Sequence, residues 1–207
     1  MENANELELV GAIIGDGHIH YKPPKYYFGL TGNKKTDFDY FLHLSGLIEF
    51  EWGKKVRIFE SGRGLRIRIY SKEIVLKLIN YFSLPFNKNK CYRVAIPKKY
   101  VADFEKCKNI IRGIADTDGS VFISSKKGSP KYPSFEITTV SKNLAEQLRE
   151  ILLIEGFRVA NLRSYKSKKS RGLAYKVCLY GKSNLNRWLG KIGFSNPHKY
   201  HKAIEAI

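Results

Sequence analysis

Two Asp-Gly pairs, Asp16-Gly17 and Asp118-Gly119, each close a nine-residue stretch of mostly small and apolar residues, LVGAIIGDG at 9–17 and IRGIADTDG at 111–119. If the two stretches pack together, their carboxylates come close, and like charges at short range raise a pKa unless a cation intervenes. A divalent ion would become the largest local charge in such a site. The pairs therefore indicate metal-assisted chemistry on oxygen ligands.

Small residues recur one helical turn apart in both stretches, at Gly11 and Gly15 and at Gly113 and Thr117. This spacing predicts two short helices whose backbones approach closely. Neither apolar run reaches the roughly 20 residues of a membrane span, so we expect the helices to pack on each other. The glycine after each aspartate predicts a left-handed C-terminal cap, with the aspartate in the last helical turn.

The chain is strongly basic, with 37 Lys and Arg against 19 Asp and Glu, a formal charge of +18 over 207 residues. Such a field favours polyanionic partners, and nucleic acid is the first candidate. There is no basic amphipathic membrane stretch and no signal peptide, so we expect no membrane partner and an intracellular, cytoplasmic location, an organelle included. Cys91, Cys107 and Cys178 are odd in number and scattered, which argues against disulfides and zinc.

The pattern that follows the first pair recurs after the second, which predicts an α+β fold of two pseudo-two-fold β-β-α-β-β-α halves with antiparallel sheets. The halves are 1–96 and 109–207, joined by a linker at 97–108. The expected elements are strands at 19–21, 26–31, 54–59 and 65–70 with a helix at 36–48, then strands at 120–125, 135–139, 157–163 and 173–180 with a helix at 142–155.

Both nine-residue copies resemble the LAGLIDADG motif, which names a family of homing endonucleases, and two copies in one chain resemble its monomeric, pseudo-symmetric members. The resemblance implies motif helices at the interface between halves and sheets that form a saddle over double-stranded DNA with a long target site. It also implies that Asp16 and Asp118 bind a divalent metal, joined by the backbone carbonyls of Gly15 and Thr117. Mg²⁺ suits such oxygen ligands, and Mn²⁺ is a substitute.

Family members also carry a basic residue near the metal, and the best matches here are Lys90 and Lys199, which we expect to stabilise charge. Many members place a polar residue at the end of the second strand. The corresponding positions are Gly32 and Thr139, and Gly32 has no side chain, so Asn33 or Lys34 is the alternative. Unequal cutting of the two strands is therefore expected.

The strand at 65–70 alternates strictly, which places Arg66 and Arg68 on one face and apolar residues on the other. A basic β-ribbon fits the major groove of DNA, whereas the alternative is an ordinary solvated face. Basic loops should contact phosphates, although a loop such as 163–172 could also serve solubility alone. The predicted DNA contacts are Lys22, Lys25, Lys34, Lys35, Arg66, Arg68, Lys126, Lys127, Arg163, Lys166, Lys168, Lys169, Arg171 and Lys176.

These observations predict a site-specific homing endonuclease that makes double-strand breaks by metal-dependent phosphodiester hydrolysis. The chain begins without a Cys or Ser splice junction and ends without a His-Asn pair, so we expect an intron-encoded enzyme rather than an intein. Two alternatives stay open at this point. One is an RNA maturase that binds intron RNA, and the other is a catalytically silent DNA-binding regulator of the same fold.

Overall fold

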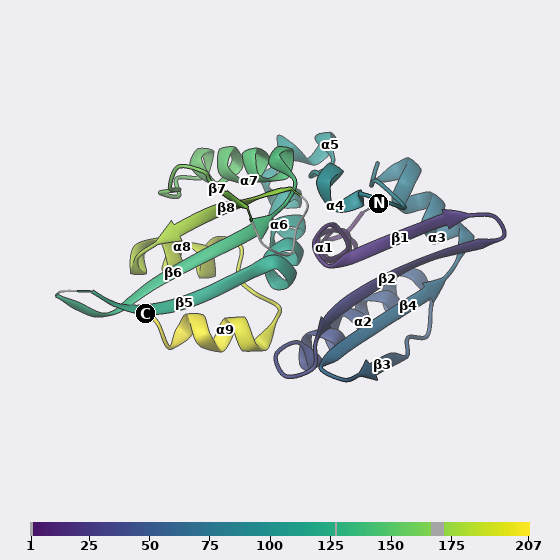
Figure 1. Cartoon of the computed structure of the whole chain (residues 1–207), viewed down its shortest axis with the longest axis horizontal. Helices are drawn as coiled ribbons and strands as arrows, with labels where there is room; N and C mark the ends of the chain where they lie inside the picture. The colour runs from purple at the N-terminus through teal and green to yellow at the C-terminus, as the bar shows by residue number, and fades with distance from the viewer. Residues whose placement is uncertain (1, 127, 167–171) are drawn as a thin grey trace.

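The computed structural model describes residues 2–126, 128–166 and 172–207, which fold into two similar halves side by side (Figure 1). The first half contains α1 (Ala4–Ile14), β1 (Gly17–Lys22), β2 (Lys25–Asn33), α2 (Phe38–Trp52), β3 (Ile58–Ser61), β4 (Gly64–Tyr70), α3 (Lys72–Leu76), the π-helix η1 (Lys77–Tyr81) and α4 (Lys90–Arg93). After α5 (Lys98–Val101), the second half contains α6 (Phe104–Asp118), β5 (Gly119–Lys126), β6 (Ser129–Thr139), α7 (Lys142–Ile154), β7 (Arg163–Lys166), β8 (Leu173–Tyr180), α8 (Lys182–Lys191) and α9 (Pro197–Ile204).

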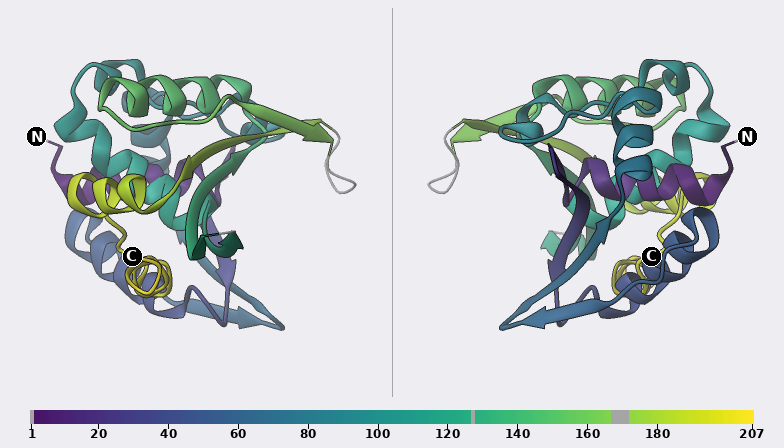
Figure 2. Two further views of the ribbon diagram at one scale, coloured as in Figure 1. Left: turned by 90° about the vertical axis from the view of Figure 1, so that its left-hand side faces the viewer. Right: turned by 90° about the vertical axis from the view of Figure 1, so that its right-hand side faces the viewer.

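Within the described residues, each half contributes an antiparallel four-stranded sheet, in the orders β1-β2-β4-β3 and β5-β6-β8-β7. The two sheets share their register as well as their order. Gly17 faces Leu30 across β1 and β2, and Gly119 faces Ile137 across β5 and β6. Helices cover one face of each sheet, and the uncovered faces of the two sheets line an open, concave side of the molecule (Figure 2). The predicted duplicated α+β fold is confirmed.

The two motif helices, α1 and α6, form the centre of the molecule. A Cβ atom added at Gly11 would lie 2.1 Å from the Ile110 carbonyl oxygen, and one at Gly113 would lie 2.2 Å from the Glu8 carbonyl oxygen. The small residues therefore permit backbone contact between the helices, as the spacing predicts. Glu8 is 2% exposed and accepts from Arg112 Nε across this interface at 2.9 Å.

Local sequence explains how these helices begin. Asn3 and Asp103 lie at the N-caps of α1 and α6, and their side chains accept from the backbone N–H groups of Glu6 and Lys106. Such caps satisfy donors that the first helical turn leaves free. α6 begins at Phe104, inside the linker predicted at 97–108. In the described parts of the chain, no helix is both long enough and apolar enough to cross a membrane.

The predicted left-handed glycine caps are wrong. Gly119 has an extended backbone, with φ −83° and ψ 153°, and Gly17 is absent from the positive-φ glycines of the described residues. These glycines serve close approach instead, because a Cβ at Gly119 would lie 2.3 Å from the Ala115 carbonyl oxygen, and one at Gly17 would lie 2.5 Å from Ile13 Cα. α1 also ends at Ile14, so the aspartate lies in the last turn of α6 but not of α1.

Two predicted strands also differ from the structure. The strand expected at 54–59 begins only at Ile58. The strand expected at 157–163 is replaced by an irregular segment with one bridge, from Val159 to Leu179, and β7 begins at Arg163. The reason is that the Phe157 N–H donates to the Leu152 carbonyl at 2.9 Å and so closes the end of α7. That residue is committed to the helix terminus.

Candidate active site

The structure brings Asp16 and Asp118 together at the junction of the two halves. Asp16 lies in the turn after α1, and Asp118 is the last residue of α6. Both line a pocket of about 230 Å³. The remaining lining residues are Ile14, Gly15, Cys91, Val94, Thr138, Thr139 and Val140.

The two carboxyl groups are half-buried and close to each other, and this governs their ionisation. Burial raises the pKa of Asp118, and the charge of Asp16 raises it further. Burial likewise raises the pKa of Asp16, with Asp37 adding to the effect, while Lys199 and Lys90 oppose it. A shared cation would relieve this repulsion, since an opposite charge nearby favours the ionised form.

Lys90 and Lys199, the two predicted basic residues, have their ammonium groups on the ends of the motif helices. Lys90 Nζ donates to the carbonyls of Ile13, Ile14 and Gly17, the last two at 3.1 and 2.7 Å. Burial lowers the pKa of Lys90 to about 8, although Asp118 opposes that shift. Cations are stabilising at helix C-termini, where carbonyls lack partners.

Lys199 makes the corresponding contacts in the second half. Its Nζ donates to the carbonyls of Ala115, Asp116 and Thr117 at 2.9, 2.7 and 3.0 Å. Burial lowers the pKa of Lys199 as well, against the pull of four aspartates. The Thr117 carbonyl, predicted as a metal ligand, is therefore engaged by a lysine. Lys90 does not donate to the equivalent Gly15 carbonyl but to the Ile14 and Gly17 carbonyls on either side of it.

The polar position at the end of the second strand differs between halves. Gly32 could not carry a side chain, because a Cβ there would lie 2.5 Å from the Phe41 ring. Thr139 lines the pocket, and its Oγ1 accepts from the Ser141 N–H at 3.2 Å. The preceding residue, Thr138, corresponds to Thr31, which donates from Oγ1 to the Asp16 carbonyl at 3.3 Å. The two halves thus offer different polar groups beside the aspartates.

From the sequence we expect Asp116 to be a structural residue and not an essential ligand, but the buried polar contacts behind the pocket were not predicted. Asp116 Oδ2 accepts from the Ser195 N–H at 2.8 Å, whereas its Oδ1 has no hydrogen-bond partner among the described residues. Burial raises the pKa of Asp116 to about 7. Asn196 is fully buried and caps α9. The Asn-Pro pair at 196–197 was the available signal, since Asn at an N-cap followed by Pro is a helix start.

The uncovered face of the first sheet is basic and aromatic. Arg66 and Arg68 are exposed there, while Leu65, Ile67 and Ile69 are buried, as the alternation predicts. The Arg68 guanidinium lies 4.9 Å from the centre of the Tyr27 ring.

The second sheet is more neutral at the equivalent place. Lys176 pairs in register with Thr138 as Arg66 pairs with Thr31, and it forms an ion pair with Glu136 at 2.6 Å.

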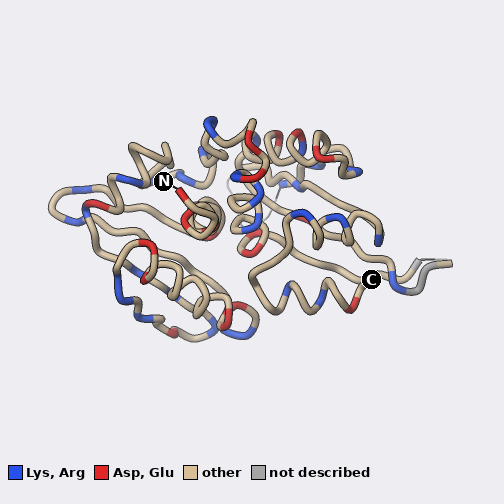
Figure 3. Tube along the Cα trace, turned by 180° about the vertical axis from the view of Figure 1, so that it is seen from behind, with Lys and Arg blue, Asp and Glu red and all other residues tan. Residues whose placement is uncertain are grey.

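Most of the predicted loop lysines and arginines are exposed. Lys and Arg residues are distributed over both halves (Figure 3). Lys34 forms an ion pair with Glu60 at the edge of the first sheet. Lys126 ends β5, but its side chain is not among those described. Lys127, Lys168, Lys169 and Arg171 lie outside the described residues. The exposed predicted contacts are Lys22, Lys25, Lys34, Lys35, Arg66, Arg68, Arg163 and Lys166.

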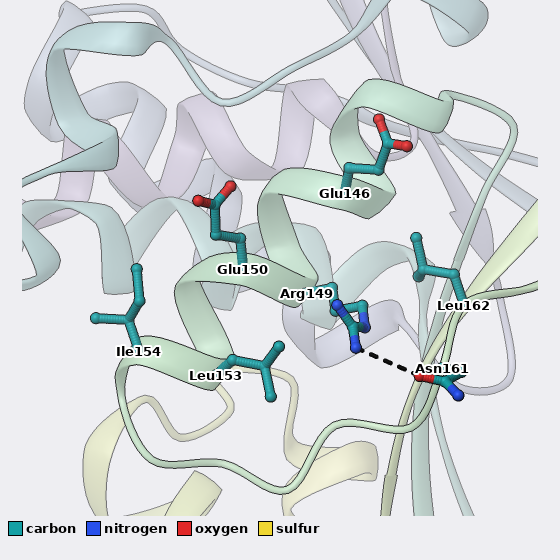
Figure 4. A pocket seen from close by; sticks show the side chains of 7 residues that line it. All are labelled: Glu146, Arg149, Glu150, Leu153, Ile154, Asn161 and Leu162. Atoms are coloured by element: carbon teal, nitrogen blue, oxygen red, sulfur yellow. Dashed lines mark hydrogen bonds between the residues drawn. The ribbon is translucent and has the colours of Figure 1, made fainter.

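A larger hollow of about 650 Å³ lies on the outer side of α7. Arg149 and Asn161 meet there through a hydrogen bond of 3.4 Å (Figure 4). Leu153 and Ile154 give it an apolar rim. Neither motif aspartate lines this hollow, so it is separate from the candidate active site.

The comparisons with known proteins agree with this architecture. Residues 105–193 match the family model described as a LAGLIDADG-like domain. The chain is 30% identical over 205 residues to the replication factor C small subunit of Methanocaldococcus jannaschii, and 24% identical over 220 residues to the tRNA-splicing ligase RtcB of Methanopyrus kandleri. These alignments cover 99% and 96% of the chain but only 10% and 22% of the relatives, so the chain spans a small part of their length.

Two solved structures show the same fold over nearly the whole chain. I-DmoI in complex with DNA and manganese matches with a TM-score of 0.63 and 18% identity, over 93% of this chain and 99% of that one. I-WcaI bound to its DNA recognition sequence matches with a TM-score of 0.65 and 16% identity, over 97% and 85%. The fold and the paired motif aspartates define a duplicated, single-chain two-motif protein. The second half therefore carries a LAGLIDADG-like domain, and nearly the whole chain shares the fold of these solved structures.

Proposed function

We propose that this protein is a site-specific DNA endonuclease that uses a divalent metal to make double-strand breaks. The observation that carries the proposal is the meeting of Asp16 and Asp118 at one pocket, each directly before the first strand of its sheet. The uncovered faces of the two sheets form a concave side (Figure 2). The charge of +18 supports a polyanionic substrate. The solved structures of similar fold, described as homing endonucleases with DNA, support duplex DNA as that substrate.

The residues at the pocket fit a hard divalent cation such as Mg²⁺, with Mn²⁺ as a substitute. Two half-buried carboxylates whose pKa values are raised by desolvation and by neighbouring carboxylates are the donors that a cation would stabilise. Among the described residues no group of three or more His, Cys, Asp or Glu side chains could hold a metal. Mg²⁺ suits this small donor set, because it is usually held by one or two carboxylates together with water and substrate phosphates. When bound, the metal would activate water and stabilise the leaving oxygen.

The protein's own residues supply the position and the field. Asp16 and Asp118 would hold the metal, with the Gly15 carbonyl as a further oxygen ligand. The Thr117 carbonyl, also predicted as a ligand, would have to be shared with Lys199. Lys90 and Lys199 fix the ends of the motif helices and keep positive charge beside the reacting phosphate. Arg66 and Arg68 would bind the duplex from the first sheet, and Lys176 from the second.

The sequence relatives support the interpretation that this chain is encoded by a mobile genetic element. Nearly the whole chain matches parts of two proteins with unrelated names, a replication factor subunit and an RNA ligase. A segment shared by unrelated proteins is expected of an element that moves between genes. Because both motifs lie in one chain, we propose that it acts as a monomer. Intron encoding and a cytoplasmic location stay predictions from the sequence.

The test is cleavage of a DNA library in Mg²⁺ and in EDTA, with sequencing of the ends. Discrete, metal-dependent double-strand ends are expected. Asp16→Asn and Asp118→Asn should each abolish double-strand cutting or reduce it to nicking, while binding in Ca²⁺ is largely kept, because each change removes a ligand and not a DNA contact. Full double-strand cleavage by both variants would refute the assignment. Tight binding without cleavage by the native protein would instead favour a regulator or an RNA-binding maturase.

A further inference from the structure

The two lysines at the ends of the motif helices lie on short helices that are each held by the opposite half. Lys90 begins α4 in the first half, and Lys199 lies in the first turn of α9 in the second half. The residues that hold these helices are the N-caps of the second helix in each half, Asp37 before α2 and Ser141 before α7.

Asp37 reaches the second half through Asn196. Asn196 Nδ2 donates to Asp37 Oδ1 at 3.2 Å and to the Asp116 carbonyl at 3.3 Å. Its Oδ1 accepts from the N–H groups of His198 and Lys199 at 3.1 and 3.4 Å. Every hydrogen-bonding group of the Asn196 side chain is thus used, and the residue is fully buried.

The Asp37 carboxylate is committed to this link and not to its own helix. Its side chain makes no capping hydrogen bond to α2. Instead, Oδ2 accepts from the Asn33 N–H at 2.7 Å, which fixes the loop before α2, and Oδ1 accepts from Asn196. A carboxylate that joins a loop of one half to a buried amide of the other is a connection between the halves, and it ends three residues before Lys199.

Ser141 makes the reciprocal contact. Its Oγ donates to the Val94 carbonyl at 2.7 Å, directly after α4, and also caps α7 by accepting from the Leu144 N–H at 3.3 Å. Gln147, two turns into α7, binds the backbone of Ile96 with both ends of its side-chain amide. Its Oε1 accepts from the Ile96 N–H at 2.9 Å, and its Nε2 donates to the Ile96 carbonyl at 3.1 Å. The second half therefore holds the segment that follows Lys90.

We propose that Asp37 and Ser141 are reciprocal positioning residues, each of which holds the short helix of the other half so that its lysine, Lys199 or Lys90, stays on the end of a motif helix. The proposal deepens the proposed function, on which its catalytic meaning rests. Each lysine caps the motif helix of its own half but is kept in place by the other half. The two active-site aspartates are then fixed only when the halves are docked.

The geometric part can be tested without DNA or metal. The whole metal-free protein is trace-labelled with acetic anhydride, and acetylation of Lys90 and Lys199 is measured by peptide mass spectrometry. In Asp37→Asn, the new side-chain NH2 faces one of the two groups that donate to the carboxylate, the Asn33 N–H or Asn196 Nδ2, so a hydrogen bond to a charged group is lost. Acetylation of Lys199 should then rise about tenfold, while acetylation of Lys90 is unchanged. Ser141→Ala should raise Lys90 alone. Asp39→Asn, the same change on an exposed residue of α2, should raise neither.

A rise of both lysines together in either variant, or no rise of the named lysine, would overturn the proposal, because it would indicate general loosening or no coupling. Melting temperatures measured in parallel separate these outcomes from global unfolding. On the cleavage site found for the native protein, Asp37→Asn should slow cleavage of one DNA strand more than cleavage of the other. Ser141→Ala should have the larger effect on the opposite strand. If the native protein cuts no DNA, the proposed function fails while the acetylation result still decides the positioning role.

Discussion

The two motif ends share their packing but differ in their last turn. Gly11 and Gly113 meet the backbone of the opposite helix at nearly equal distances. Beyond that contact the halves diverge: α1 stops at Ile14, whereas α6 continues to Asp118. Backbone contact at the centre of the interface constrains both copies equally, because a carbonyl cannot move aside without displacing a helix. The turn beyond it is free to differ.

This divergence changes the surroundings of the two aspartates. Lys199 engages the carbonyl before Asp118, while Lys90 leaves the one before Asp16 uncontacted and reaches Gly17 instead. The position two residues before Asp118 is the buried Asp116, and the equivalent residue in the first motif is Ile14. Two sites with unequal ligands and unequal neighbouring charge should cut the two strands at unequal rates, as the difference between Gly32 and Thr139 also predicts.

The largest expected effect concerns the contact between α1 and α6, which is the same in both halves. Gly11→Ala and Gly113→Ala should each destabilise the fold by about 3 kcal/mol or more, because the added methyl group meets a backbone carbonyl. Urea unfolding followed by circular dichroism measures this. Gly46→Ala, in the middle of α2 with nothing within 4 Å of its added Cβ, should instead stabilise by up to about 1 kcal/mol. If Gly113→Ala destabilised the fold while Gly11→Ala did not, the two helices would not be equally packed.

The asymmetric part predicts a pH-dependent difference. Burial raises the pKa of Asp116 from the usual 3.8 to about 7, so the folded state retains a proton that the unfolded chain releases. Stability from this group is therefore greatest in acid, falls as pH rises between about 4 and about 7, and stays low above. Asp116→Asn removes the charge and should stabilise by up to about 4 kcal/mol at pH 8 and by little at pH 4.

The check is the melting temperature across this pH range in EDTA, so that metal binding does not contribute. Ser195→Ala is the matched control, because it keeps the backbone N–H that donates to Asp116. An equal effect of Asp116→Asn at both ends of the range would show that Asp116 is ionised throughout, and that the two motifs do not differ in this way.

Much of this arrangement followed from the sequence because it is encoded in the spacing of residue types along single helices and strands. The small-residue spacing gave the helix contact, and the alternation at 65–70 gave the buried and exposed faces of β4. The predictions that failed concern how the helices end, where the residue types allow more than one backbone geometry. Gly17 and Gly119 pack against the preceding turn instead of adopting positive φ, and Phe157 is taken up by the end of α7.

The site was predictable as a pair of acids but not as a set of contacts. Asp16 and Asp118 do meet at one pocket. The positions of Lys90 and Lys199 beside the site were also predicted, yet their bonds to helix carbonyls were not, because any lysine near two acids suggests the acids as partners. The link from Asp37 to Asn196 joins residues 159 apart in the chain, and no local pattern marks it.

The smallest expected effect concerns the two sheet faces. Glu136 forms an ion pair with Lys176 at 2.6 Å on the second sheet, whereas Arg66 and Arg68 of the first sheet are exposed. Glu136→Gln should free Lys176 for phosphate, tighten DNA binding a few-fold, and steepen its salt dependence by up to about one unit. Fluorescence anisotropy in Ca²⁺ at several salt concentrations measures both quantities.

Glu146→Gln is the control for charge alone, because Glu146 pairs with Lys142 on α7, the helix that covers the other face of the sheet. It removes the same charge but no partner of a predicted DNA contact, so the long-range field changes equally while the local competition does not. If the two variants tighten binding by the same factor, net charge explains the gain and the second sheet is as available to DNA as the first. A gain confined to Glu136→Gln would show that an internal ion pair weakens one of two otherwise equivalent DNA-binding faces.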